Sequence, residues 1–175
     1  MMRTLWRRAI VVVPPPLDMA LVQPIRERFD PMVSLMPCHI TLVFPFESDL
    51  SAEHLRAHVE LATEGVTPFA ITLTGITGSE SEYLFLEVER GRARIIGLHD
   101  RLYSEPLKAH LSRTHTFTPH VTVGRLRNHA AFEAALAAVA QNEIQIQTVA
   151  RSVAVYRMAE DQWLREFEVG FGNSD

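Results

Sequence analysis

The sequence predicts an α+β fold, because its strand and helix patterns occur in a mixed order that includes a hairpin and two final strands. Apolar residues make up 47% of the 175 residues, which is typical of a chain that buries a core. No low-complexity tract or long run of one charge sign interrupts them, so we expect one ordered domain over residues 1–175. A helical pattern also precedes and follows each of two similar strands, and a duplicated, two-lobed fold would explain this approximate internal repeat.

The first half of the chain is predicted to contain a strand at 8–13, a helix at 19–29, a strand at 39–44 and a helix at 51–63. Asp30-Pro31 ends the first helix, because a residue before proline disfavours helical geometry; Pro24 either begins the regular part of that helix or kinks it. Pro45 is expected to stop the second strand. Ser51 is a suitable N-cap for the second helix.

The second half is predicted to contain strands at 69–76 and 83–88, a helix at 93–110, a strand at 120–126, a helix at 132–140 and strands at 144–156 and 163–169. The polar, glycine-containing residues 77–80 suit a hairpin between the first two strands. Pro106 is a point at which the helix can end early.

The N-terminal segment only superficially resembles a secretion signal. Arg3, Arg7 and Arg8 precede an apolar run over residues 9–13, but three prolines end that run, and a strand closed by a turn explains it better. No stretch is long enough to span a bilayer, so we expect a cytoplasmic protein.

Cysteine and histidine spacing argue against a metal site. Cys38 is the only cysteine, which excludes an internal disulfide and a cysteine-rich zinc site. Its neighbour His39 raises the alternative of a Cys/His nucleophile, but adjacent strand residues face opposite sides, so Cys38 should face the packed side. His110, His115 and His120 are spaced by five residues, which matches no common zinc pattern.

Charge is unevenly distributed. The net charge of -4 argues against a protein that coats nucleic acid through bulk electrostatics. Residues 90–127 nevertheless hold eight basic side chains against two acidic ones. This stretch is either a solvated helix face or a wall for a polyanion.

Two segments share the pattern His, apolar, Thr, apolar: His39 to Leu42 and His120 to Val123. One His-x-Thr tripeptide is expected by chance about half the time in such a chain, so a single copy would mean little. Both copies lie in apolar strands shortly after a proline and are 81 positions apart. The period of two in a strand places each histidine and its threonine on one face.

Two imidazoles suit chemistry at a phosphodiester, where one group takes a proton from the attacking oxygen and another gives one to the leaving oxygen. The ordinary histidine pKa of about 6.5 keeps both protonation states accessible near neutrality. Thr41 and Thr122 would hydrogen-bond the non-bridging phosphate oxygens. This mechanism needs no metal.

These motifs resemble those of the 2H phosphoesterase superfamily, which includes 2'-5' RNA ligase-like proteins and 2',3'-cyclic phosphodiesterases. The flanking segments 43–46, 117–119 and 26–31 are also similar, and the resemblance covers nearly the whole chain. It implies a pseudo-twofold fold of two intertwined lobes, with a central groove between two sheets. It also implies catalysis by His39 and His120 on RNA ends or nucleotide-type phosphodiesters. We expect a monomer without a cofactor.

The resemblance extends to Arg125, which is similar to an arginine that often follows the second motif and can bind phosphate; an exposed arginine at a strand end is the alternative. Phe44 shares the face of the core residues in a regular strand, so Phe46 is the candidate for stacking on a base. One departure is that Cys38 separates Pro37 from His39, whereas Pro119 directly precedes His120. A binding module that holds the same ligands without turnover, and a zinc-dependent hydrolase, remain as alternatives.

Overall fold

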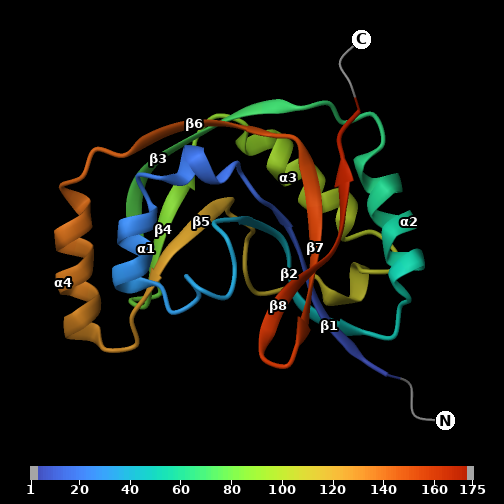
Figure 1. Ribbon diagram of the computed structural model, residues 1–175, viewed down its shortest axis with the longest axis horizontal. Coiled ribbons are helices and arrows are strands. Elements are labelled where there is room, and N and C mark those ends of the chain that lie inside the picture. Colours follow the sequence, from blue (N-terminus) through green and yellow to red (C-terminus); the bar gives the residue numbers. More distant parts are fainter. Residues whose placement is uncertain (1–3, 173–175) are drawn as a thin grey trace.

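The computed structural model describes residues 4–172 and has the predicted α+β class (Figure 1). Its strands are β1 (Trp6–Val12), β2 (Ile40–Ser48), β3 (Phe69–Ser79), β4 (Tyr83–Val88), β5 (His120–Arg125), β6 (Gln145–Ala150), β7 (Ser152–Ala159) and β8 (Gln162–Gly170). Its helices are η1 (Pro16–Met19), α1 (Gln23–Phe29), α2 (Ala52–Thr63), α3 (Arg92–Leu102), η2 (Lys108–His110) and α4 (His129–Ala140).

The strands form one antiparallel sheet in the order β6-β3-β4-β5-β2-β1-β7-β8. This order consists of two four-stranded halves, and the strands that carry the two motifs, β2 and β5, lie at the centre. A single residue pair, Ile40 with Val121, connects β2 to β5. The chain itself crosses between the halves twice, from β2 through α2 to β3 and from β6 through Arg151 to β7, the latter across the top of Figure 1.

The helices interlock the two halves. Helix α1 precedes β2 but packs on β5, and α3 precedes β5 but packs on β2. Helices α2 and α4 follow these strands and pack on β8 and β3. Each half therefore receives one helix from the chain segment that leads into the other half, which gives the two lobes an approximate twofold relation.

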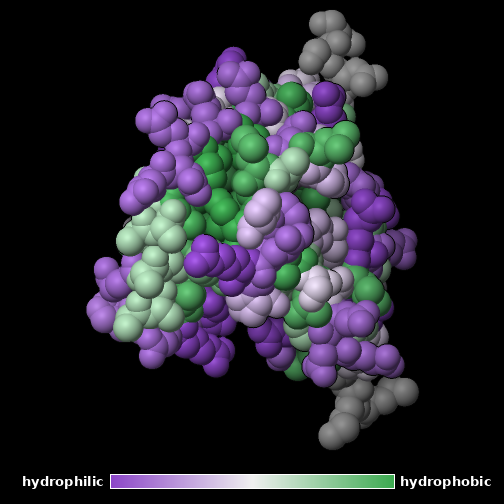
Figure 2. Space-filling model, turned by 60° about the vertical axis from the view of Figure 1, so that its left-hand side comes forward, coloured by the Kyte–Doolittle hydropathy of each residue, from purple (hydrophilic) through white to green (hydrophobic). Residues whose placement is uncertain are grey.

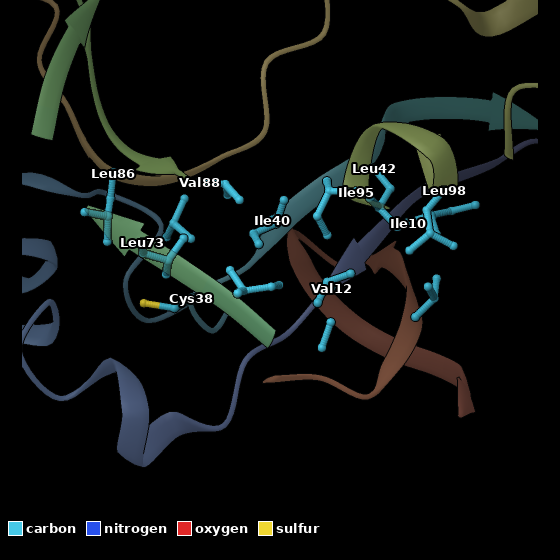
Figure 3. Packing of buried hydrophobic residues seen from close by; sticks show 14 of the residues in the cluster. Ile10, Val12, Cys38, Ile40, Leu42, Leu73, Leu86, Val88, Ile95 and Leu98 are labelled. Atoms are coloured by element: carbon cyan, nitrogen blue, oxygen red, sulfur yellow. The ribbon is translucent and has the colours of Figure 1, made fainter. Parts of the chain in front are cut away.

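The core lies beneath the central strand pair. Ile40 and Val121 are fully buried, at 0% exposure each. In Figure 3, Ile40 lies among apolar side chains contributed by both halves, with Leu73 and Leu86 toward one side and Leu42 toward α3 on the other. The packing that holds the two halves together therefore also fixes the strands that carry the motifs.

One outer side of the molecule carries an apolar patch bordered by polar residues (Figure 2). Helix α4 is rich in alanine and buries only Phe132, Ala135 and Val139, so most of its alanines face outward and contribute to the pale green area in Figure 2. Leu17 and Leu21, around η1, are also exposed. Phe29 of α1 approaches Gly124 from this side, so this surface lies behind the sheet, on the face opposite His120.

Two irregularities change the side-chain alternation near the motifs. In β2, Phe44 and Pro45 stand opposite the single residue Ala9, since Val43 pairs with Ile10 and Phe46 pairs with Arg8. In β5, an extra residue lies between Thr122, which pairs with Phe85, and Gly124. Each bulge turns the residues that follow it to the other face of the sheet.

Several predicted element ends are wrong. Pro45 does not stop the second strand, because it lies in the bulge of β2, where a missing N–H is tolerated. The helix at 93–110 ends at Leu102, before Pro106. The strand at 144–156 is two strands, which pair with β3 and β1 respectively and are separated by Arg151. Pro24 begins the regular part of α1, and Arg3 lies outside the described residues.

We predict that Gly124→Ala destabilises the fold, because the added methyl would lie 2.9 Å from Leu84 Cδ1 and 3.0 Å from Phe29 Cβ. A loss of about 1–3 kcal/mol in the free energy of unfolding is expected. Gly97→Ala is the control, since nothing lies within 4 Å of its added methyl in the middle of α3, and it should gain about 0.5–1 kcal/mol. Urea denaturation measures both, and changes of the same sign would contradict the prediction.

Candidate active site

The two motifs run antiparallel and side by side. Ile40 pairs with Val121, and continuing that register by one residue in each direction brings His39 beside Thr122 and Thr41 beside His120. All four side chains are half-buried, whereas Ile40 and Val121 between them are buried. Imidazoles and hydroxyls from segments far apart in the sequence therefore share one face.

Both imidazoles are held in the same way by the backbone. His39 Nδ1 lies 2.8 Å from the carbonyl oxygen of Pro37, and His120 Nδ1 lies 2.7 Å from that of Thr118. A carbonyl oxygen only accepts, so each Nδ1 carries a hydrogen and each Nε2 is the atom that gains or loses a proton. The different spacing of Pro37 and Pro119 leaves this arrangement unchanged.

Burial lowers the pKa of both imidazoles below the ordinary value, and the backbone hydrogen bonds oppose this effect. For His39, the charges of Arg26 and His120 lower the pKa further, and Asp30 opposes them. For His120, the carboxylate of Glu87 raises the pKa. The charge of His120 thus acts on His39, as expected for two rings on one face of neighbouring strands.

Strand β4 contributes two residues that the sequence analysis missed. The ring of Phe85 stacks on that of His120, with a centroid distance of 3.5 Å and an interplanar angle of 20°. Glu87 is the direct cross-strand partner of His120. The signal was the regular alternation of β4, which buries Leu84 and Leu86 and leaves Phe85 and Glu87 on the other face.

A buried arginine fixes the segment that leads to His39. Arg26 donates from Nε to Asp30 Oδ2 over 2.7 Å, from a terminal nitrogen to the carbonyl of Met36 over 2.9 Å, and to Cys38 Sγ over 3.6 Å. Asp30 Oδ1 also accepts from the N–H of Met32. Residues 26–31, one of the segments that resemble the superfamily, therefore have a structural role: they anchor the loop that ends at His39.

A pocket of about 540 Å³ opens beside His120 and Thr122, whereas His39 and Thr41 are not among its lining residues. Its aromatic lining residues are Phe44, Tyr83, Phe85, Tyr103 and Phe117. None of its described lining residues is a lysine or an arginine.

The expectation for the phenylalanines of β2 is wrong. Phe46 is 4% exposed and belongs to the core, so it cannot stack on a ligand, whereas Phe44 is 49% exposed and lines the pocket. The bulge at Phe44 and Pro45 exchanges the faces that a regular strand would give these two rings.

Arg125 faces the same side as Thr122, because the bulge in β5 shifts the alternation. Its Nε contacts Glu82 Oε1 at 2.6 Å, and its guanidinium lies over the ring of Tyr83. A phosphate would have to compete with Glu82 for this arginine, so phosphate binding by Arg125 stays a prediction.

The basic stretch 90–127 does not wall the pocket. Arg101 donates to the carbonyls of Leu61 and Glu64, and Arg94 donates to that of Thr67. These two arginines thus bind backbone carbonyls of other segments, and no described lysine or arginine of the stretch is among the residues that line the pocket.

Cys38, which the sequence analysis considered as a nucleophile, and His58 have structural surroundings. Cys38 is buried at 7% exposure, and burial raises the pKa of its thiol, which disfavours a nucleophile. His58 joins two helices by a 2.8 Å contact from Nε2 to the carbonyl of Leu102. Within residues 4–172, no three histidine, cysteine or acidic side chains are placed to hold a metal ion, and no helix is both long and apolar enough to cross a membrane.

Comparison with known proteins identifies the family. A sequence model of the 2'-5' RNA ligase superfamily matches residues 13–162. The chain belongs to this superfamily. It is thereby a member of the 2H phosphoesterase group that its two motifs resemble.

Relatives and solved structures agree with this assignment. A Bacillus pumilus protein named "Putative phosphoesterase" is 27% identical over 142 residues, which cover 79% of this chain and 81% of the relative. A similarly named protein from Geobacillus kaustophilus is 28% identical over 162 residues, covering 88% and 90%. The structure of Escherichia coli LigT complexed with 3'-AMP matches with a TM-score of 0.64 at 15% identity, covering 96% and 99% of the two chains, and therefore shares the fold.

Removing Arg26 tests the anchoring of the loop in this superfamily member. Arg26→Met leaves the buried carboxylate of Asp30, 6% exposed, without its partner, and we expect the free energy of unfolding to fall by about 3–5 kcal/mol. Arg28→Met removes an exposed guanidinium of the same helix and should change stability by less than about 1 kcal/mol. Equal effects in thermal and urea unfolding would show that the buried network does not anchor the loop.

Proposed function

We propose that this protein is a metal-independent phosphoesterase that acts on the 2',3'-cyclic phosphate or 2'-5' phosphodiester of RNA ends or nucleotides. The observation that carries the proposal is the antiparallel pairing of the two motifs, with Nδ1 of each imidazole tied to the backbone and each Nε2 left to titrate. A phosphorus between two such imidazoles meets one base and one acid when the pair holds a single proton.

The reaction moves two protons, and the pair of imidazoles holds one proton before and after it. The unprotonated Nε2 accepts a proton from the attacking oxygen, and the protonated Nε2 donates one to the leaving oxygen on the opposite side of phosphorus. Thr41 and Thr122, each beside the histidine of the other motif, donate hydrogen bonds to the non-bridging oxygens. Phe85 holds the ring of His120 in place by stacking.

The pocket supports a nucleotide-type substrate. Its volume of about 540 Å³ and aromatic lining suit an uncharged planar group, and its described lining lacks lysine and arginine for a second phosphate. Phe44 takes the stacking role first given to Phe46, because it is the exposed ring of β2. LigT has been crystallised with 3'-AMP and with ATP, which is consistent with nucleotide binding by this fold.

A binding module without turnover is the alternative. Phosphate binding alone could use threonine and arginine, whereas two imidazoles with free Nε2 atoms favour proton transfer. Incubation with a 2',3'-cyclic phosphate oligonucleotide, followed by product analysis, distinguishes the two.

Each histidine is predicted to be essential for turnover. His39→Ala and His120→Ala should each lower kcat by about 10²- to 10⁴-fold on a panel of 2',3'-cyclic and 2'-5'-linked substrates, with no loss on adding chelator to the parent protein. His54→Ala, on an exposed helix face, is the control. Full activity of either folded variant would refute the two-histidine mechanism, and inhibition by chelator would indicate the zinc-dependent alternative.

Phe44→Ala is predicted to weaken recognition of the base. KM for a nucleoside 2',3'-cyclic phosphate should rise by roughly 5- to 150-fold, because stacking on an aromatic ring contributes about 1–3 kcal/mol per base. Turnover of a cyclic phosphate that lacks a base should be unaffected. Leu164→Ala removes an equally exposed apolar side chain and serves as the control. Equal losses on both substrates would show that Phe44 does not read the base.

A further inference from the structure

A carboxylate that faces an anion-binding site weakens the binding of the anion, so its presence there calls for a functional explanation. Glu87 lies opposite His120 in the β4–β5 pairing and on the same face of β4 as Phe85, whose ring covers that histidine. A negative charge at this position repels a phosphodiester.

Two neighbouring side chains hold the carboxylate of Glu87 in position. The hydroxyl of Thr77 donates to Glu87 Oε1 over 2.7 Å, and a guanidinium nitrogen of Arg92 lies 4.0 Å from Oε2. The side chain is 29% exposed, so its charge is only partly screened by water.

The surroundings of the two imidazoles differ. The buried ion pair of Arg26 and Asp30 acts on His39, with the lowering effect of Arg26 on the pKa larger than the raising effect of Asp30, whereas a carboxylate stands across the strand pair from His120. The other charged or titratable groups on this face are His39 across the β2–β5 pair, Arg92 behind Glu87, and the pocket-lining Glu80, Tyr83, His99, Tyr103, His110 and His115. Glu82 and Arg125 pair with each other at the far end of β5. Glu87 differs from all of these groups because it is the charged residue of β4 that pairs directly with His120.

We propose that Glu87 is a positioning residue for His120: its carboxylate keeps the proton of the singly protonated pair on His120 and leaves His39 as the free base. The raising effect of Glu87 on the pKa of His120 agrees with this role. The preference of the proton for His120 can be measured without substrate, but its consequence for turnover rests on the proposed phosphoesterase function.

The test compares Glu87→Gln with Glu89→Gln, which removes an exposed carboxylate two residues further along the chain. Histidine titrations followed by NMR should show that the pKa of His120 falls in Glu87→Gln and is unchanged in Glu89→Gln. Glu87→Asp, which keeps the charge, should restore at least about half of the difference. An unchanged His120 titration in Glu87→Gln, or an equal fall in both Gln variants, would overturn the proposal.

Activity gives a second readout. Because both imidazole pKa values are lowered, kcat/KM of the parent should be maximal below pH 6.5, and in Glu87→Gln its alkaline limb should move to lower pH. At pH 7.5 the variant should lose about three- to tenfold in kcat/KM, but less than about twofold at its own optimum. A uniform loss at every pH would mean that Glu87 contacts substrate instead. Absence of turnover in the parent, with the NMR shift intact, would refute the phosphoesterase function alone.

Discussion

The pairing of Ile40 with Val121 is the contact on which the site depends. It is the residue pair through which the two four-stranded halves join at the centre of the sheet, and both side chains are fully buried. Helix α1, which leads into β2, packs on β5, and helix α3, which leads into β5, packs on β2. Separating β2 from β5 would therefore also disturb the packing of these two helices. The spacing of the two imidazoles is therefore set by the core rather than by flexible loops, as a reaction that requires close positioning demands.

The sequence was sufficient to predict the fold class, the order of most elements and the pairing of two similar motifs, because these follow from periodicity and from a repeated tripeptide. It failed where one strand contains an extra residue. The bulge at Phe44 exchanged the predicted fates of Phe44 and Phe46, and the bulge before Gly124 turned Arg125 toward the face of Thr122. A bulge depends on what the partner strand supplies, so local alternation cannot reveal it. The division at Arg151 has the same origin, since only the sheet order shows that its two sides pair with different halves.

The functional residues that sequence analysis missed are those that act through a neighbour. Phe85 and Glu87 have no motif of their own, and their importance comes from their place opposite Thr122 and His120 across a strand pair. Arg26 is a third case, because its partners extend over the following twelve residues and meet only after the loop closes around the guanidinium. The strand alternation of β4 and the resemblance of residues 26–31 were the available signals. Each signal pointed to a strand face or a segment that holds an important side chain, but neither indicated what that side chain contacts.

The charge of the groove explains why the imidazoles carry so much of the proposed chemistry. The described lining of the pocket has no lysine or arginine, and Arg125 is already paired with Glu82. Neutral hydroxyls and a backbone-held imidazole are then left to meet the phosphate. Burial lowers the pKa of both rings, so the two imidazoles of the free groove are mostly neutral near pH 7. An arriving phosphodiester brings a negative charge that raises the pKa of a nearby imidazole, and binding therefore draws in the proton that the leaving oxygen later needs. In such a site, substrate affinity and acid catalysis depend on the same proton, and a carboxylate beside His120 helps to decide where that proton resides.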